Sequence, residues 1–192
     1  MSGARSAWEA RAENLGESLS GVLFKGFSSG ANGVLHDWHT KIIEEILVPR
    51  VREGGAFADL GCGYGRLANV LADRRPDLFL IGQDLSHHYC AMLARDGRPS
   101  VQADLARLPF RPASLAGAMA VTSLMYADRD RLAEIMAGIR RMLEPGAPFL
   151  VLDPGEELRS VIARLGAARV QSSTGGKGFH RDEYLRIAKG AG

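Results

Sequence analysis

The chain has 192 residues, enough for one well-packed domain with a small appendage. Hydrophobic residues make up 46% of it and charged residues 24%, which excludes the disordered and fibrous classes of protein. The 24 basic and 22 acidic side chains leave a net charge of +2, too balanced to indicate a nucleic-acid partner.

The two cysteines, Cys62 and Cys90, are too few for a disulfide scaffold and favour a reducing compartment. No apolar run approaches the roughly 20 residues that cross a bilayer. The charged N-terminus also lacks the apolar stretch of a secretory signal. We therefore expect a cytoplasmic protein with no membrane partner, either a monomer or a homodimer.

The pattern of residue types in the N-terminal part differs from that in the rest of the chain. We expect a helical lid segment at residues 1–50 before a domain at residues 51–192. Residues 5–20 are typical of a short helix. A loop rich in glycine and serine follows at residues 26–33, where small residues favour a hinge. Residues 34–48 then carry apolar side chains at helical spacing.

From residue 56 the pattern alternates between strands and helices. The expected strands are 56–61, 78–84, 99–104, 115–123 and 148–153. The expected helices are 66–74, 86–95, 130–143 and 156–165, and two further strand candidates, 167–174 and 183–189, follow in the tail. This alternation predicts an α/β fold with a doubly wound, Rossmann-like sheet, mostly parallel with an antiparallel C-terminal strand. Ligands in such sheets bind beyond the carboxyl ends of the strands.

The first expected strand ends in a glycine-rich turn, Asp59-Leu60-Gly61-Cys62-Gly63-Tyr64-Gly65. Glycines at alternate positions let the backbone turn tightly and approach a ligand closely. A dinucleotide-binding fingerprint would place its third glycine where this chain has Arg66. The spacing therefore disfavours NAD and FAD.

Two more aspartates end the second and third expected strands. Asp84 could accept hydrogen bonds from the hydroxyls of a ribose, and Asp104 could accept from an adenine amine. Each aspartate could instead be an ordinary helix cap. Three carboxylates at successive strand ends, with Asp59 as the first, favour a nucleoside site.

Taken together, FADLGCGYG, IGQDLS, ADLARLPF and RRMLEPGAPFLVL resemble the motif series of class I S-adenosylmethionine-dependent methyltransferases. The resemblance covers roughly residues 56–155 and departs from the family at Ala147, where a second glycine is frequent. It implies S-adenosylmethionine as the cofactor and a small-molecule methyl acceptor. The cofactor site that it implies comprises Asp59, Gly61, Cys62, Gly63, Gly65, Asp84, Leu85, Asp104, Leu105 and Thr122.

Within that implied site, Asp59 would lie near the methionine amino group and the three glycines along the methionine and adenosine. Asp84 would hold the ribose, and Asp104 with Leu105 would border the adenine.

The acceptor side is less defined. Tyr126 follows the fourth expected strand and is the candidate group facing the acceptor, although a packing role explains it equally well. Asp153 is a weaker candidate, because it could cap the next helix. His36 or His39 could act as a general base, and we take His36 as the candidate, with a solvated helix face as the alternative for both. We expect no metal site.

Trp8 and Trp38 could cover the cofactor or anchor the lid segment, and we favour anchoring for Trp38. The sequence after the fourth strand lacks the Asn/Asp-Pro-Pro-aromatic tetrapeptide of amino-methylating DNA enzymes. It also lacks a cysteine nucleophile. We therefore expect methyl transfer to a small molecule at an oxygen, nitrogen or carbon. The alternatives are a non-methylating enzyme with the same cofactor and a cofactor-binding regulatory module.

Overall fold

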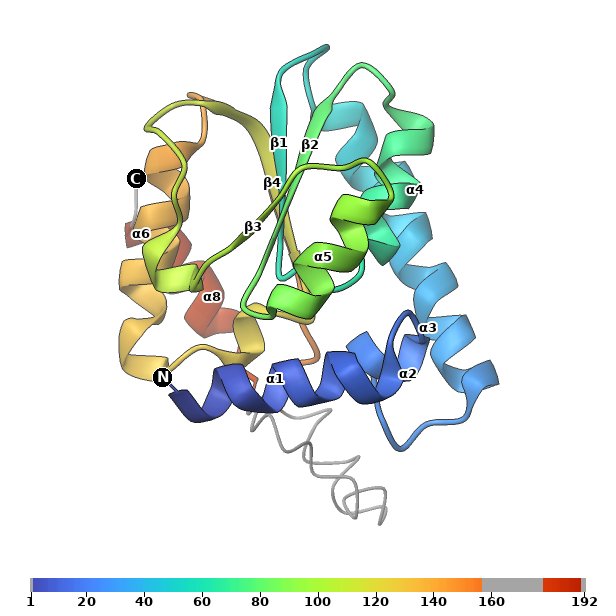
Figure 1. Ribbon diagram of the computed structural model, residues 1–192. Coiled ribbons are helices and arrows are strands. Elements are labelled where there is room, and N and C mark those ends of the chain that lie inside the picture. The colour runs from blue at the N-terminus through green and yellow to red at the C-terminus, as the bar shows by residue number, and fades with distance from the viewer. Residues whose placement is uncertain (1, 157–177, 191–192) are drawn as a thin grey trace.

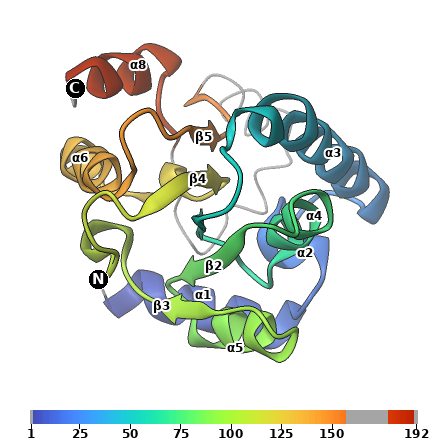
Figure 2. The same ribbon diagram turned by 90° about the horizontal axis from the view of Figure 1, so that it is seen from above.

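The computed structural model describes residues 2–156 and 178–190. Its centre is a parallel sheet of five strands in the order β3-β2-β1-β4-β5 (Figure 2). The strands are β1 (Ala56–Leu60), β2 (Phe79–Asp84), β3 (Ser100–Gln102), β4 (Leu115–Val121) and β5 (Phe149–Leu152). The chain moves outward from β1 to β3 and then crosses back to β4, so the strand order reverses beside β1. The predicted doubly wound sheet is confirmed, and the reversal marks where a ligand binds in such sheets.

Strand β4 is apolar along its whole length, as expected of a strand that helices cover on both faces. All seven of its residues are buried, and most are small or unbranched. Gly117 is required because a Cβ there would lie 2.7 Å from Cε2 of Phe57 on β1. The continuous apolar run thus correctly predicted a strand that is covered on both faces.

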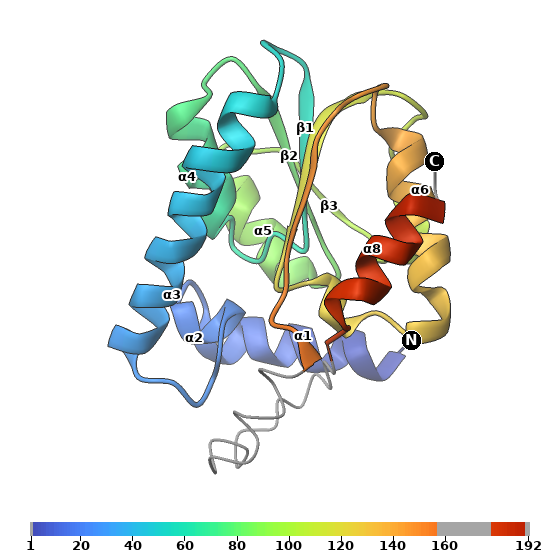
Figure 3. The ribbon, with the colours of Figure 1, turned by 180° about the vertical axis from the view of Figure 1, so that it is seen from behind.

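Helices α3, α4 and α5 cover one face of the sheet (Figures 1 and 3). They are α3 (Ser29–Ile42), α4 (Arg66–Arg74) and α5 (His87–Arg95). Helix α3 continues through a π-helical turn (Ile43–Leu47) into a 3₁₀ turn (Val48–Arg50). Ile43 and Leu47 are buried with Phe57 of β1 and Leu71 of α4 in one apolar cluster. This cluster joins the N-terminal segment to the sheet.

Helices α6 (Leu132–Met142) and α8 (Arg181–Gly190) lie on the opposite face (Figures 1 and 3). Leu132, Ile135 and Ile139 repeat at helical spacing along α6 and are buried against Ala118 and Ala120 of β4. The small β4 side chains leave room for the larger ones of α6. Short 3₁₀ turns occur at Leu105–Arg107, Leu124–Tyr126 and Arg129–Arg131.

Helix α8 corrects the prediction of an antiparallel strand at residues 183–189. Tyr184 and Ile187 are three positions apart and pack together with Phe179 on the apolar cluster of α6. Asp182 and Glu183 in the first turn also favour a helix, because carboxylates stabilise a helix N-terminus. The other strand candidate, 167–174, and almost all of the helix expected at 156–165 lie outside the described residues.

The N-terminal segment begins with α1 (Ser2–Leu15) and α2 (Leu19–Val22), where the sequence predicted one short helix. Helix α1 runs along the carboxyl edge of the sheet (Figures 1 and 3). The expected glycine-rich hinge is shorter than predicted, because Ser28 caps α3 by accepting a hydrogen bond from the amide of Ala31. The side chain of Asn32 is buried. Its amide nitrogen donates a hydrogen bond to the carbonyl of Phe24, and its oxygen accepts one from the amide of Phe24, which favours the early helix start.

None of the helices in the described ranges is both long and apolar enough to span a bilayer.

Candidate functional site

A cavity of about 220 Å³ lies between the carboxyl ends of β1, β2 and β4 and the N-terminal helices. The expected site residues that line it are Asp59, Gly61, Cys62, Gly63, Asp84, Leu85, Asp104, Leu105, Thr122 and Tyr126. Gly65 and His36 do not line it. The structure therefore brings together most of the candidate residues at the place where the strand order reverses.

The glycine-rich turn forms the floor of the cavity. Gly61 has φ +77°, and a Cβ there would lie 2.4 Å from the Cβ of Ser123, so only glycine fits. Gly65 has φ +90° and precedes α4, and its Cβ would lie 2.4 Å from Cδ1 of Leu93. Gly65 therefore allows α4 and α5 to pack closely and does not face the cavity.

Asp84 connects the end of β2 to the glycine-rich turn. Its Oδ2 accepts a hydrogen bond from the amide of Gly63 at 2.9 Å, and its Oδ1 accepts from the amide of Ser86 at 2.8 Å. The cap of α5 is Ser86, whose hydroxyl accepts from the amide of Tyr89. Burial raises the pKa of Asp84 to about 6, and the amides of Ser86 and Gly63 limit the rise. Asp84 is thus a buried cavity carboxylate and is not the helix cap.

Asp59 lies on the neighbouring strand and is also buried. Burial raises the pKa of its carboxyl to about 7, the positive charge of Arg66 opposes this rise, and the negative charge of Asp84 adds to it. Two carboxyls in one cavity favour a ligand that carries hydroxyl or ammonium donors.

Asp104 caps a 3₁₀ turn at the end of β3, where its Oδ1 accepts from the amide of Ala106 at 2.9 Å. It nevertheless lines the cavity together with Leu105. The capping alternative is therefore correct for Asp104, and it leaves the second carboxylate oxygen without a role in the cap.

The end of β4 is held in an unusual conformation. Thr122 has φ +55°, which is strained for a β-branched residue. Its amide donates to the carbonyl of Leu152, and its hydroxyl donates to the carbonyl of Val22 at 3.4 Å. These contacts hold a strained backbone at the cavity wall, where such strain is typical of functional sites.

Tyr126 follows in the same loop, and its ring meets the ring of Trp8 edge to face with centroids 4.9 Å apart. Both residues line the cavity. Trp8 therefore forms part of the cavity wall, while Trp38 is 51% exposed and does not anchor the segment. The buried Ile43 and Leu47 anchor it instead.

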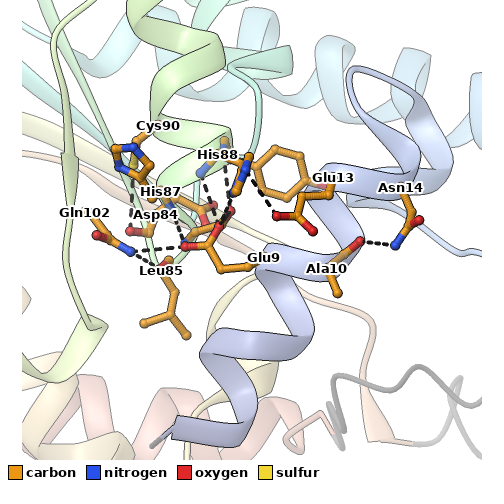
Figure 4. Close-up of polar contacts among 12 residues, drawn as sticks. Glu9, Ala10, Glu13, Asn14, Asp84, Leu85, His87, His88, Cys90 and Gln102 are labelled. Carbon is orange, nitrogen blue, oxygen red and sulfur yellow. Dashed lines mark hydrogen bonds and ion pairs between the residues drawn. The ribbon is translucent and has the colours of Figure 1, made fainter.

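Glu9 fastens α1 to the N-terminus of α5 (Figure 4). Its carboxylate accepts hydrogen bonds from the Ser86 hydroxyl at 2.7 Å, the His87 amide at 2.8 Å and Nδ1 of His88 at 2.8 Å. Burial alone would raise the pKa of this carboxyl, but the bonds from His88, His87 and Ser86 outweigh it and lower the pKa to about 2. The positive end of the α5 dipole adds to the attraction.

His36 and His39 lie on α3, away from the cavity lining. Burial and the adjacent Arg66 lower the pKa of His36, and they lower the pKa of His39 to about 3. Both rings contact the guanidinium of Arg66, with Nδ1 of His36 3.0 Å from Nη1. The structure thus gives His36 a contact with Arg66, neither a position in the cavity nor a solvated face.

The cavity residues that sequence reasoning missed include Arg66, Gln83 and Arg131. Arg66 could have been found, because it follows the glycine-rich turn directly.

The role of Asp153 is explained only by the fold, since its carboxylate accepts a hydrogen bond from the hydroxyl of Tyr184 on α8 at 2.6 Å. Across the described ranges, no cluster of three or more His, Cys, Asp or Glu residues could hold a metal ion.

Comparison with known proteins connects this geometry to a family. The family model described as a methyltransferase domain matches residues 57–146. An O-methyltransferase of Pyrenophora dematioidea is 32% identical over 118 residues, which cover 55% of this chain and 43% of that protein. An O-methyltransferase of Aspergillus nomiae is 31% identical over 123 residues, covering 58% of this chain and 53% of that protein. The chain thus spans about half the length of these curated relatives.

Solved structures agree with the fold. A chain from the complex of the Haloferax volcanii Trm112 methyltransferase activator with a methyltransferase has a TM-score of 0.69 at 22% identity, covering 96% of this chain and 75% of that one. The Streptomyces coelicolor geranyl diphosphate C-methyltransferase, in complex with S-adenosyl-L-homocysteine, has a TM-score of 0.67 at 16% identity, covering 100% of this chain and 79% of that one. The matched residues contain the glycine-rich turn and all three strand-end aspartates. Residues 57–146 are thus similar to a methyltransferase domain, and the solved structures agree with the fold.

Proposed function

We propose that this protein transfers the methyl group of S-adenosylmethionine to a hydroxyl oxygen of a small molecule. The observation that carries the proposal is the cavity in which strand-end carboxylates and the glycine-rich turn meet an aromatic wall of Trp8 and Tyr126. The names of the two curated relatives, both O-methyltransferases, support oxygen as the methylated atom.

The residues present fit the cofactor. The buried Asp84 carboxylate can accept from the ribose hydroxyls, and Asp104 with Leu105 borders the adenine. A Cβ at Gly61 or Gly63 would collide with Ser123 or Val22, so glycine is needed to keep the turn in this conformation beside the cavity. Thr122, which lines the cavity at the end of β4, would contact the methionine part in this proposal. The bound cofactor supplies an electrophilic methyl group, and the protein orients the two reactants and excludes water.

The aromatic wall is our proposed acceptor side. A flat or apolar acceptor can pack on Trp8, while the hydroxyl of Tyr126 orients the group that receives the methyl. Trp8 is the residue before Glu9, so the bonds of Glu9 to α5 fix the position of this wall. Residues 1–50 thus act as a lid in this proposal, with α1 as the part that covers the site.

The proposal is tested with the purified chain, S-adenosylmethionine and separate pools of phenols, aliphatic alcohols, carboxylic acids and amines. Formation of S-adenosylhomocysteine and the mass of the product are followed by mass spectrometry. We expect turnover with a hydroxyl pool and a product heavier by one methyl group. Turnover with the amine pool alone contradicts oxygen methylation. Cofactor binding without turnover in any pool favours the regulatory-module alternative.

A further inference from the structure

Helix α3 and the π-helical turn that follows it carry an exposed apolar stripe. Three of the large apolar side chains that are exposed within residues 2–156 and 178–190 lie here, namely Val34 (71%), Trp38 (51%) and Ile46 (41%). The half-buried Ile42 lies between Trp38 and Ile46, so the four residues of the stripe are each four positions apart. Apolar side chains that gather in this way on a surface mark an interaction site.

The π-helical turn keeps Ile46 on the same side of the helix as Trp38. In a regular α-helix, side chains four positions apart drift around the axis, because each turn contains 3.6 residues. A π-helical turn bonds residues five positions apart and is therefore wider, which offsets this drift between Ile42 and Ile46. Ile43 and Leu47 of the same turn remain buried against the sheet. The stripe thus continues in line from α3 into the turn.

One flank of the stripe carries charges in an order that complements itself. Asp37 and Lys41 are exposed and lie one helical turn apart beside Trp38. Lys41 also approaches Glu45 of its own chain at 3.8 Å, an exposed pair that contributes little. When two copies of a helix pack antiparallel around a two-fold axis, residue i of each copy contacts residue j of the other. Asp37 of each copy then meets Lys41 of the other, which gives two opposite-charge pairs in one interface.

The same antiparallel pairing matches the apolar residues along the whole stripe. With the two-fold axis between Trp38 and Ile42, each Trp38 packs on Ile42 of the other copy. Val34 and Ile46 then meet at both ends of the contact. Tryptophan is enriched at the centres of protein interfaces, where it dominates the binding energy. One chain therefore supplies both halves of the match, in its apolar residues and in its charges.

We propose that α3 is a dimerisation helix, whose stripe binds the same stripe of a second copy of this chain around a two-fold axis. Helix α3 lies at the periphery of the molecule, remote from α6 and α8 (Figures 2 and 3). The four stripe residues do not line the cavity. The proposal therefore goes beyond methyl transfer and does not depend on it.

The test is sedimentation velocity of the purified chain at increasing concentration, and we expect the wild type to form a dimer. Trp38→Glu places a carboxylate near the centre of the stripe in both copies. It should raise the Kd of the dimer by at least about a hundredfold. Leu185→Glu is the matched control, because Leu185 is 45% exposed on another helix, α8. This variant should keep the wild-type Kd.

A charge exchange tests the pairing itself. Asp37→Lys places two like-charge contacts in each interface and should raise the Kd of the dimer about tenfold. Combining Asp37→Lys with Lys41→Asp reverses the sign of both partners and restores the opposite-charge pairs. The double variant should therefore return to within about threefold of the wild-type Kd.

Three outcomes contradict the proposal. A wild type that stays monomeric at every concentration shows that the stripe does not bind a second copy. A dimer that survives Trp38→Glu has its interface elsewhere, and Val34→Lys gives the same information if thermal melts show that Trp38→Glu does not fold. A double charge variant as weak as Asp37→Lys excludes the antiparallel pairing. Turnover does not enter these measurements, so this proposal and the methyl-transfer proposal fail separately.

Discussion

At the scale of single residues, Asp84 has two roles that a measurement can separate. It orders the glycine-rich turn through the amide of Gly63, and in our proposal it also binds the ribose. We expect Asp84→Ala to weaken binding of S-adenosylhomocysteine by about ten- to several hundredfold. It should also lower the free energy of unfolding by about 1–3 kcal/mol, because the buried amides of Gly63 and Ser86 lose their acceptor.

Asp84→Asn keeps an amide oxygen as one acceptor. It should therefore lower the affinity for S-adenosylhomocysteine and the free energy of unfolding less than Asp84→Ala does. Asp96→Asn is the control, since Asp96 is an exposed carboxylate at the other end of α5. Thermal melts and cofactor titrations on the same samples provide the comparison. Intact affinity in Asp84→Ala, with stability lowered, would remove Asp84 from the cofactor site.

His39 should make stability depend on pH. Its pKa falls from 6.5 to about 3 on folding, so below pH 6.5 the unfolded chain binds a proton that the folded chain does not. The stability present above pH 6.5 is therefore lost as the pH falls toward 3, by up to about 1.4 kcal/mol per pH unit. His39→Gln cannot titrate and should lack this contribution.

The measurement is the free energy of unfolding by urea between pH 7 and pH 4 for both proteins. Asp59 contributes the opposite slope, because its raised pKa means that the folded chain holds the extra proton below about pH 7. This contribution is shared by both proteins and largely cancels in their difference. Parallel pH curves would show that His39 does not remain neutral in the fold.

At the scale of elements, the contact between α1 and α5 depends on Glu9. Glu9→Gln removes the charge that faces the α5 N-terminus and one acceptor of His88 (Figure 4). We expect the amides of α1 to exchange with deuterium about five- to thirtyfold faster, since bonds to charged groups contribute roughly 1–2 kcal/mol at a partly exposed site. The KM for the acceptor should rise with it, because Trp8 moves with α1.

Glu17→Gln serves as the control for charge. Glu17 forms an exposed pair with Arg95 at 3.5 Å, and such pairs contribute little. Faster exchange in α1 after Glu9→Gln, without a change after Glu17→Gln, supports the contact. Exchange of α1 at the wild-type rate in both variants would show that Glu9 does not control the lid.

At the scale of the whole molecule, ligand binding should stabilise the fold selectively. A ligand at a hundred times its Kd stabilises a folded protein by about 2.7 kcal/mol, which corresponds to a rise in Tm of about 5–10 °C for a chain of this size. We expect S-adenosylhomocysteine to produce this rise and NAD to produce none. The glycine spacing with Arg66 at the dinucleotide position is the reason. A rise with NAD alone would contradict the cofactor.

Much of the fold and of the cofactor site could be predicted from the sequence, because these features depend on local patterns. The apolar run of β4 and the spacing of Gly61, Gly63 and Gly65 are properties of short segments. The carboxyl ends of neighbouring parallel strands meet at one edge, so Asp59 and Asp84 had to lie close together.

Helix α8 shows where local pattern was insufficient. Residues 183–189 contain apolar side chains that suit either a strand or a helix, and a short segment does not distinguish the two. Packing of Tyr184 and Ile187 on α6 selects the helix.

The sequence alone determined the five strands of the sheet and the strand ends that face the cavity, since both follow from residues close together in the chain. Only the tertiary structure decided that Glu9 meets His88, that Trp8 meets Tyr126, and that His36 contacts Arg66. These pairs are separated by 79, 118 and 30 positions respectively. Such contacts arise because burial of the apolar faces brings distant segments together, and no local periodicity encodes which polar side chains then meet.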